Sequence, residues 1–420
     1  MIRKAAMTAT AIVAASVMAL AGCGSSGGDS ASGGDSAKKT DAFVLGGLWP
    51  ETGSLAYLAA PELAAEKLAV KDINDAGGVL GKDITTVDAD TSDADHADQN
   101  SSAMQSVMSK NPSFVIGPAS SSVVKNVYKT ITESKVPMLS MGATSSDFSG
   151  LSPYFFRTVP PDTVQGTVLG QVIAQDGVKN LAVAVFNDEY GTGLRDTVVK
   201  TVKDAGVNVV YGEKDAFDPT ETNFSSIATA IKASNPDAVA VIAFDQTKPL
   251  LKALASAGVD THKLYFVDGN TADYSKDLDA GLLEGAKGTI PGAHASDDFI
   301  KNMESAYGKS LEGTYTYGAE TYDGIILAAL AATKGGSADG ETIQKNMAAV
   351  SGASGGEKCT TYKDCVAAIK AGKDIQYSGQ TGIGPFNENN DPSSANIGVY
   401  KFDAKNAPQF DHTQSGSVPK

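Results

Sequence analysis

Two groups of small hydroxyl residues each follow a short apolar run in the first third of the chain. Phe114–Ile116 precedes three serines, Ser120–Ser122, and Pro137–Ser140 precedes a second small-residue turn, Gly142–Ser146. The first N–H groups of a helix lack partners and the helix dipole favours an anion, so hydroxyls at such a point suit a carboxylate. The stretch therefore predicts a carboxylate-binding site. The alternative is that both are ordinary helix-capping turns.

The elements around this stretch alternate between strand and helix over most of the chain. Short apolar runs predict strands at 42–48, 84–89, 114–116, 137–140, 180–186, 207–211, 238–243 and 264–267. Amphipathic spacing predicts helices at 59–76, 95–110, 194–205, 224–233, 249–257, 297–307, 319–333 and 341–350, and one after Ser122. This order is typical of an α/β fold with two Rossmann-like lobes built on parallel sheets.

Composition limits the classes of function. The chain has 420 residues, of which 42% are hydrophobic and 20% charged, and its formal net charge is −15. This length suits two or three domains. The acidic balance argues against binding nucleic acid or anionic lipid through a broad basic face. No complete phosphate loop, calcium loop, catalytic triad or dinucleotide fingerprint is present, so we expect no enzyme, no cofactor and no metal.

The N-terminus has the features of an export signal. Arg3 and Lys4 precede a small apolar run that ends at Leu20-Ala-Gly-Cys23. This tetrapeptide resembles a bacterial lipobox, which implies that residues 1–22 are removed and that Cys23 carries lipid. A plain secretory signal or an uncleaved anchor is the alternative. Residues 23–41 are rich in Gly, Ser and Asp and predict a flexible tether.

Two further cysteines, Cys359 and Cys365, are left in the exported part of the chain. An even pair in an exported protein is explained most simply by a disulfide. A metal site would need further ligands nearby, and none of the four histidines is close in sequence.

A series of short motifs follows in order along the chain: Pro50-Glu-Thr-Gly53, Ala69–Gly78, Val79–Lys82, Ile116–Pro118 with Ser120–Ser122, Val136–Ser140 with Ala143-Thr144, Phe156–Thr158, Asp162 with Gln165-Gly166, Asn187–Leu194 and Tyr322-Asp323. In their order and spacing these motifs resemble those of the branched-chain amino-acid (Leu/Ile/Val) binding proteins of ABC importers, the type I periplasmic-binding family. The resemblance spans nearly all of residues 42–402.

The resemblance implies two lobes joined by a hinge of three crossovers that close on a ligand. We expect one lobe to comprise 42–162 and 294–395, and the other 163–293 and 396–412. Such a protein would be a monomer, held on the extracytoplasmic side of the cell membrane by its lipid. It would deliver a small ligand to ABC permease subunits.

The resemblance also assigns candidate ligand contacts. Ser121 and Thr144 would hold a carboxylate, with N–H groups of the turn that includes Ala143. The carbonyl of Gly142 and the hydroxyl of Thr144 would meet an ammonium. Tyr190 would close from the second lobe, and Asp268 would neutralise the ammonium, with Asp245 as a second candidate. The side-chain pocket would involve three apolar or aromatic residues that depart from the family pattern: Tyr57, Leu58 and Phe244.

The expected ligand is an apolar or branched-chain amino acid. Amides, urea and aromatic acids remain alternatives because the side-chain pocket departs from the family pattern. A ligand sensor with the same fold is an alternative to a transport component.

Overall fold

The computed structural model describes residues 42–292 and 294–418. The predicted signal peptide (1–22), the tether (23–41) and Cys23 lie outside the described residues.

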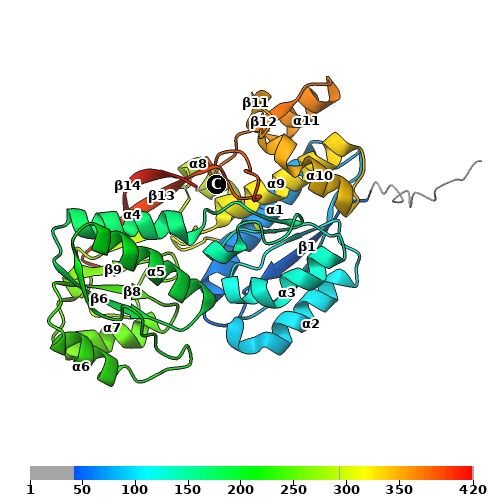
Figure 1. Cartoon of the computed structure of the whole chain (residues 1–420). Coiled ribbons are helices and arrows are strands. Elements are labelled where there is room, and N and C mark those ends of the chain that lie inside the picture. The colour runs from blue at the N-terminus through cyan, green and yellow to red at the C-terminus, as the bar shows by residue number, and fades with distance from the viewer. Residues whose placement is uncertain (1–41, 293, 419–420) are drawn as a thin grey trace, which may run out of the picture. The chain divides into compact units, whose positions relative to one another are not determined.

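The first sheet has five parallel strands in the order β2-β1-β3-β4-β5. Its strands are β1 (Val44–Trp49), β2 (Thr85–Asp90), β3 (Phe114–Ile116), β4 (Met138–Ser140) and β5 (Phe155–Arg157). The connecting helices are α1 (Ala59–Asp75), α2 (Ala97–Met108) and α3 (Ser121–Glu133). Figure 1 shows α2 and α3 together on one face and α1 on the other.

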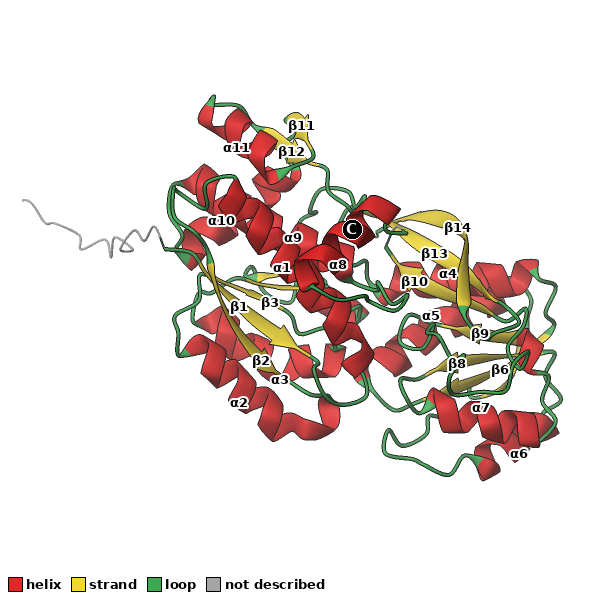
Figure 2. Cartoon of the chain, turned by 180° about the vertical axis from the view of Figure 1, so that it is seen from behind, coloured by secondary structure: helices red, strands yellow, loops and turns green. Residues whose placement is uncertain are grey.

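The second sheet has seven strands in the order β14-β13-β10-β9-β8-β6-β7. Its strands are β6 (Asn180–Val185), β7 (Asn208–Tyr211), β8 (Ala238–Ile242), β9 (Leu264–Phe266), β10 (Lys287–Pro291), β13 (Ser394–Phe402) and β14 (Pro408–Ser417). The helices α4 (Asp162–Gln175) and α5 (Glu189–Asp204) pack together, as do α6 (Ser225–Ala233) and α7 (Thr247–Ser256). Figure 2 shows β13 and β14 at one edge of this sheet.

The chain passes between the two sheets three times. It leaves the first sheet after β5, leaves the second after β10, and returns to the second at β13. Between the last two crossings lie α8 (Asp297–Tyr307), α9 (Gly318–Gly335), α10 (Gly340–Ser351), β11 (Glu357–Cys359), α11 (Tyr362–Lys370) and β12 (Ile375–Tyr377). Short 3-10 helices cover Ala56–Leu58, Ala94–His96, Ser146–Phe148 and Thr261–Lys263.

Helix α9 is the buried centre of the first half because its sequence is apolar on every side. Its stretch Ile325–Ala332 is buried throughout and packs against α1, α10 and β3. A helix that is hydrophobic all round must be covered by other elements. At Gly324 an added Cβ would lie 2.7 Å from a side-chain methyl of Leu139 on β4, so glycine lets the helix pack against the sheet without displacing that side chain.

The α/β prediction is confirmed, with additions that the sequence did not predict. The second sheet is mixed, because β13 pairs antiparallel with both β10 and β14. The helix predicted at 194–205 begins earlier, at Glu189. The elements β5, α4, β10, α11 and β11–β14 were not predicted. The predicted disulfide between Cys359 and Cys365 is present.

Candidate functional site

One wall of the candidate site is formed by the ends of β3 and β4. Ser120 caps α3 by accepting a hydrogen bond from the N–H of Val123 at 3.4 Å. The next residue, Ser121, accepts from the N–H of Ser145 at 3.3 Å, which joins the two turns. Gly142 lies in the second turn. Ser121 and Gly142 both line a small cavity between the two sheets.

The opposite wall comes from the carboxyl ends of strands in the second sheet. Tyr190 lies in the first turn of α5, where Asp188 caps the helix, and Asp268 follows β9. The phenol of Tyr190 donates to Oδ1 of Asp268 at 2.6 Å. Phe244, which follows β8, stacks on Tyr190 with ring centroids 5.4 Å apart. Parallel strands end at one edge of a sheet, which brings these residues together.

A third group of side chains closes the cavity from the side of the first sheet. Tyr57 and Leu58 come from the 3-10 helix before α1, and Tyr317 is the N-cap of α9. The hydroxyl of Tyr57 donates to the backbone oxygen of Asp268 at 3.2 Å. The hydroxyl of Tyr317 donates to Oδ2 of Asp268. Three tyrosines therefore meet at Asp268, two of them from across the cleft.

Burial governs the charges of this group. Burial raises the pKa of Asp268 above its usual range, while hydrogen bonds from Tyr190, Tyr317 and Gln165 oppose that shift. Burial, followed by the charge of Asp268, raises the pKa of Tyr190 well above its usual value. The tyrosines therefore remain protonated donors at neutral pH.

The cavity enclosed by these residues measures about 10 Å³. That is about the space of one water molecule. The ring of Tyr317 fills the region beside Gly142, where an added Cβ would lie 3.0 Å from the ring. A ligand of amino-acid size therefore requires the two walls to separate or Tyr317 to swing away.

Polar contacts across the cleft hold the two walls together near this cavity. Ser122 on α3 donates to Oδ2 of Asp188 at 2.5 Å, and the ammonium of Lys125 lies 2.5 Å from Oε2 of Glu189. Ser122 is the neighbour of Ser121, and Asp188 caps the helix that carries Tyr190. Opening of the cleft would therefore break these contacts and move Ser121 and Tyr190 apart.

Seven of the nine predicted ligand contacts line the cavity, and two do not. The seven are Tyr57, Leu58, Ser121, Gly142, Tyr190, Phe244 and Asp268. Ala143 and Thr144 do not line it; both are fully buried. Asp245, the second candidate for the ammonium, is exposed and does not line the cavity.

Thr144 belongs to a buried polar group next to the cavity. Its Oγ1 and both carboxyl oxygens of Asp162 are buried without a hydrogen-bond partner among the described residues, as is Oε1 of Gln165. The N–H of Asp162 donates to the carbonyl of Thr144 at 2.7 Å. Burial, followed by the charge of Asp268, raises the pKa of Asp162 well above its usual value. Polar groups buried in this way favour a hydrogen-bond partner nearby.

Sequence reasoning missed Tyr317. It precedes α9 in a left-handed conformation, with φ of 63°, and it reaches Asp268 from 49 positions away. No local pattern marks such a residue. A positive φ in a bulky residue, which costs conformational energy, was visible only in the structure.

Within 42–292 and 294–418, no three His, Cys, Asp or Glu side chains gather closely enough to hold a metal ion. In the same ranges, no helix combines the length and apolar character required to cross a membrane.

The family is decided by a match of the periplasmic binding protein profile to residues 43–368. The chain belongs to the periplasmic binding protein family. It is thus an extracytoplasmic solute-binding protein of the kind that serves ABC importers.

Curated relatives of this periplasmic binding protein agree with that assignment. The leucine-, isoleucine-, valine-, threonine- and alanine-binding protein of Pseudomonas aeruginosa is 27% identical over 71% of this chain and 80% of its own. The Leu/Ile/Val-binding protein BraC3 of Rhizobium johnstonii is 28% identical over 86% of this chain and 91% of its own.

Solved structures share the type I fold. The branched-chain amino-acid transporter protein LivJ of Streptococcus pneumoniae, in complex with isoleucine, has a TM-score of 0.72 at 19% identity, covering 90% of this chain and 99% of its own. A solute-binding protein of R. palustris, in complex with 4-hydroxybenzoate, has a TM-score of 0.70 at 20% identity, covering 90% of this chain and 98% of its own.

Proposed function

We propose that this protein binds a zwitterionic amino acid with an apolar side chain and delivers it to the permease of an ABC importer. The observation that carries the proposal is the meeting of the serine turn at Ser121 with the carboxylate of Asp268 across one buried cavity. A helix start suits the ligand carboxylate, and a buried anion suits its ammonium.

The side-chain end of the ligand would lie among Leu58, Phe244 and Tyr57, which are apolar or aromatic at this cavity. The relatives named for leucine, isoleucine and valine support this part of the proposal. Thr144 and Asp162 would take part when the walls separate, because their buried oxygens lack partners among the described residues.

A second candidate ligand is an aromatic acid. In this structure both carboxylate oxygens of Asp268 accept hydrogen bonds from tyrosines, Tyr190 and Tyr317, so the site already satisfies its anion without a ligand cation. An aromatic carboxylate could use the turn at Ser121 and stack on Tyr190 and Phe244. The R. palustris protein bound to 4-hydroxybenzoate supports considering this class.

Isothermal titration calorimetry with the purified chain would test both candidates. We expect leucine, isoleucine or valine to bind, and leucinamide and 4-methylpentanoate, which lack the carboxylate and the ammonium respectively, to bind much more weakly. Binding of 4-methylpentanoate or 4-hydroxybenzoate in preference to leucine would overturn the amino-acid proposal in favour of an acid ligand. Binding of none of these compounds would overturn both.

Further parts of the proposal concern organisation and location. We propose lobe limits of 42–162 with 294–395 and of 163–293 with 396–412, a monomeric protein, and a lipid on Cys23 that holds it at the cell membrane. We propose that the protein has no catalytic activity. A sensor role would use the same ligand site, and loss of amino-acid uptake in a strain lacking this protein would distinguish transport from sensing.

A further inference from the structure

A second and much larger pocket lies beside the small cavity. It measures about 500 Å³ and is bounded by the segment 313–320, which leads into α9, and by β10, β13 and β14 of the second sheet. Tyr57 and Tyr317 line both the small cavity and this pocket. The two spaces are therefore neighbours that share part of one wall, whereas Ser121, Tyr190 and Asp268 line only the small cavity.

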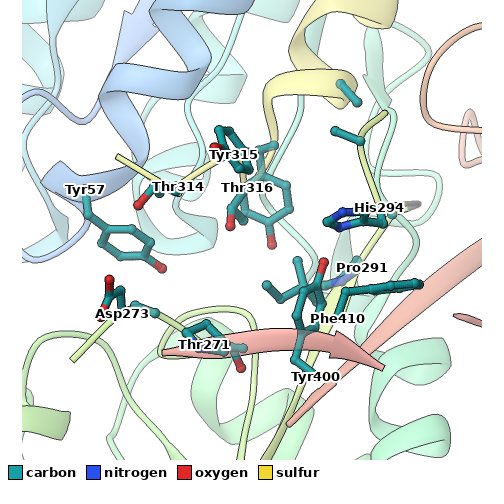
Figure 3. Close-up of a pocket in the computed structure, with 18 of the residues that line it drawn as sticks. Tyr57, Thr271, Asp273, Pro291, His294, Thr314, Tyr315, Thr316, Tyr400 and Phe410 are labelled. Atoms are coloured by element: carbon teal, nitrogen blue, oxygen red, sulfur yellow. The ribbon is translucent and has the colours of Figure 1, made fainter. Parts of the chain in front are cut away.

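Aromatic rings surround the larger pocket. Figure 3 shows Tyr57, Tyr315, Tyr400 and Phe410 around its open centre. Tyr400 and Phe410, on paired strands, meet edge to face at 5.7 Å between ring centroids. Phe410 is 40% exposed, the one large hydrophobic side chain so exposed among the described residues. The faces of such rings attract organic cations, most strongly where the cation is removed from water.

The pocket wall carries two acidic side chains and one histidine. Asp273 and Glu320 line it, as does His294, which stacks on Phe410 with ring centroids 4.6 Å apart. No lysine or arginine is among the described residues that line it. Glu320 is 4% exposed. Burial raises the pKa of the Glu320 carboxyl to about 8, and a hydrogen bond from its own backbone N–H opposes that shift. A cation bound against Glu320 would favour the ionised form of this carboxyl, which burial disfavours.

Gly292 makes room for this carboxylate. Its φ is +106°, and an added Cβ would lie 2.2 Å from Oε1 of Glu320. Any larger residue would clash with the acid. Glu320 also lies in the first turn of α9, where a carboxylate stabilises the helix through its dipole whether or not a ligand is bound. That helix role explains neither the ring of aromatic side chains nor the lack of lysine and arginine on the described part of the pocket wall.

We propose that this pocket is a second ligand site, which binds a small organic cation, a primary amine or quaternary ammonium on an apolar body. The positive charge would lie against Glu320, and the apolar body would pack between Tyr400, Phe410 and Tyr315. The site needs no carboxylate on its ligand, which separates its ligand class from that of the small cavity.

Calorimetry with phenethylamine would test the proposal, because 2-phenylethanol and phenylacetate present a similar body with no charge and with a negative charge. We expect phenethylamine and phenyltrimethylammonium to bind, the alcohol to bind at least tenfold more weakly, and the acid not to bind. Failure of both cations to bind would overturn the proposal.

Variants locate the site. We expect Glu320→Gln and Phe410→Ala each to weaken phenethylamine binding at least tenfold, and Glu66→Gln, a matched buried carboxyl on α1 outside the pocket, to leave it unchanged. Phe410 is exposed, so its variant tests the pocket even if Glu320→Gln does not fold. If Asp268→Asn lost phenethylamine binding and Phe410→Ala kept it, the amine would lie in the small cavity, and the second site would be overturned. Leucine binding to the Phe410→Ala protein reports on the amino-acid proposal separately, and we expect it to persist.

Discussion

The phenol of Tyr190 donates a hydrogen bond of 2.6 Å to Oδ1 of Asp268, from a helix of the second sheet to the loop after its strand β9. Tyr317 reaches Oδ2 of the same carboxylate from the helix α9, on the side of the first sheet. One buried anion therefore ties together three segments that are remote in sequence. An ammonium at this point would share Asp268 with the two tyrosines or displace one of them, since a carboxylate has about four acceptor positions.

We expect Asp268→Asn to weaken leucine binding by about 2–5 kcal/mol, because it would strand the ligand ammonium in a buried site. Asparagine keeps the shape of the side chain and one acceptor for the tyrosines, so the fold is expected to persist. Calorimetry of leucine binding, with circular dichroism as a check on folding, would measure the effect. Asp245→Asn is the matched control, because Asp245 is an exposed strand-end aspartate outside the cavity. Unchanged leucine affinity in both variants would contradict an ammonium at Asp268.

The sequence was sufficient for the parallel strands of both sheets other than β5 and β10, because strands such as Phe114–Ile116 and Asn180–Val185 are apolar runs bounded by turns. It failed for β14, whose residues Pro408–Ser417 are mostly polar and exposed, since an edge strand needs no apolar pattern. It also failed for β5, whose three residues, Phe155–Arg157, are too few to show a period.

The start of α5 was predicted too late in the chain. The predicted helix begins at Leu194, whereas α5 begins at Glu189 and includes Gly191 and Gly193. In the structure a Cβ on Gly191 would lie 2.7 Å from the ring of Phe186, so this glycine lets the helix pack closely. The contact joins a helix to the end of its preceding strand, and composition alone could not distinguish it from a flexible turn.

Tyr317, a site residue that the sequence did not predict, is brought to the site by a tertiary contact. Ser121, Gly142, Tyr190 and Asp268 follow strands or begin helices, and a pattern of strand ends could locate them. Tyr317 is brought in by a loop more than 40 residues from any of them, and no local signal predicts its contact with Asp268.

We expect Asp391→Ala to lower the free energy of unfolding by about 3–5 kcal/mol, because it would leave a buried arginine unpaired. Arg157 on β5 lies 2.5 Å from Oδ1 of Asp391, and both side chains are almost fully buried. Arg157 also donates to the carbonyl of Ser145 in the turn of the site, at 2.7 Å. Urea denaturation would give the value. As a control, Glu312→Ala removes an exposed ion pair with Lys276 and should cost at most about 1 kcal/mol.

We expect replacement of both Cys359 and Cys365 by serine to lower the free energy of unfolding by roughly 2–3 kcal/mol in the chain-entropy model. The bond links the end of β11 to α11, across a sequence separation of 6. Thermal unfolding with and without reductant would measure it, since reductant should lower the melting temperature of the wild type alone. Equal sensitivity of wild type and variant would contradict a structural role for the bond.

We expect Cys23→Ser to move the protein from the membrane fraction to the soluble or secreted fraction, because lipid on this residue is the proposed anchor. Fractionation of cells expressing each form would show the change. Leucine binding by the released protein should match that of the wild type, because the proposed ligand site lies in the described part of the chain. Retention of the variant in the membrane fraction would rule out the lipobox.

We expect the protein to become less stable as the pH rises from about 5 to about 9. Burial, followed by the charge of Asp88, raises the pKa of Glu66 to about 9, and burial raises that of Glu320 to about 8, from the ordinary glutamate value of 4.5. Between those limits the folded chain keeps protons that the unfolded chain loses, so the free energy of unfolding falls with rising pH, by an amount on the order of a few kcal/mol. Melting temperatures at pH 5, 7 and 8.5 would show the slope. Glu66→Gln imitates the protonated carboxyl and should flatten it, and a Glu66→Gln protein with the wild-type slope would show that this carboxyl is already ionised in the folded chain.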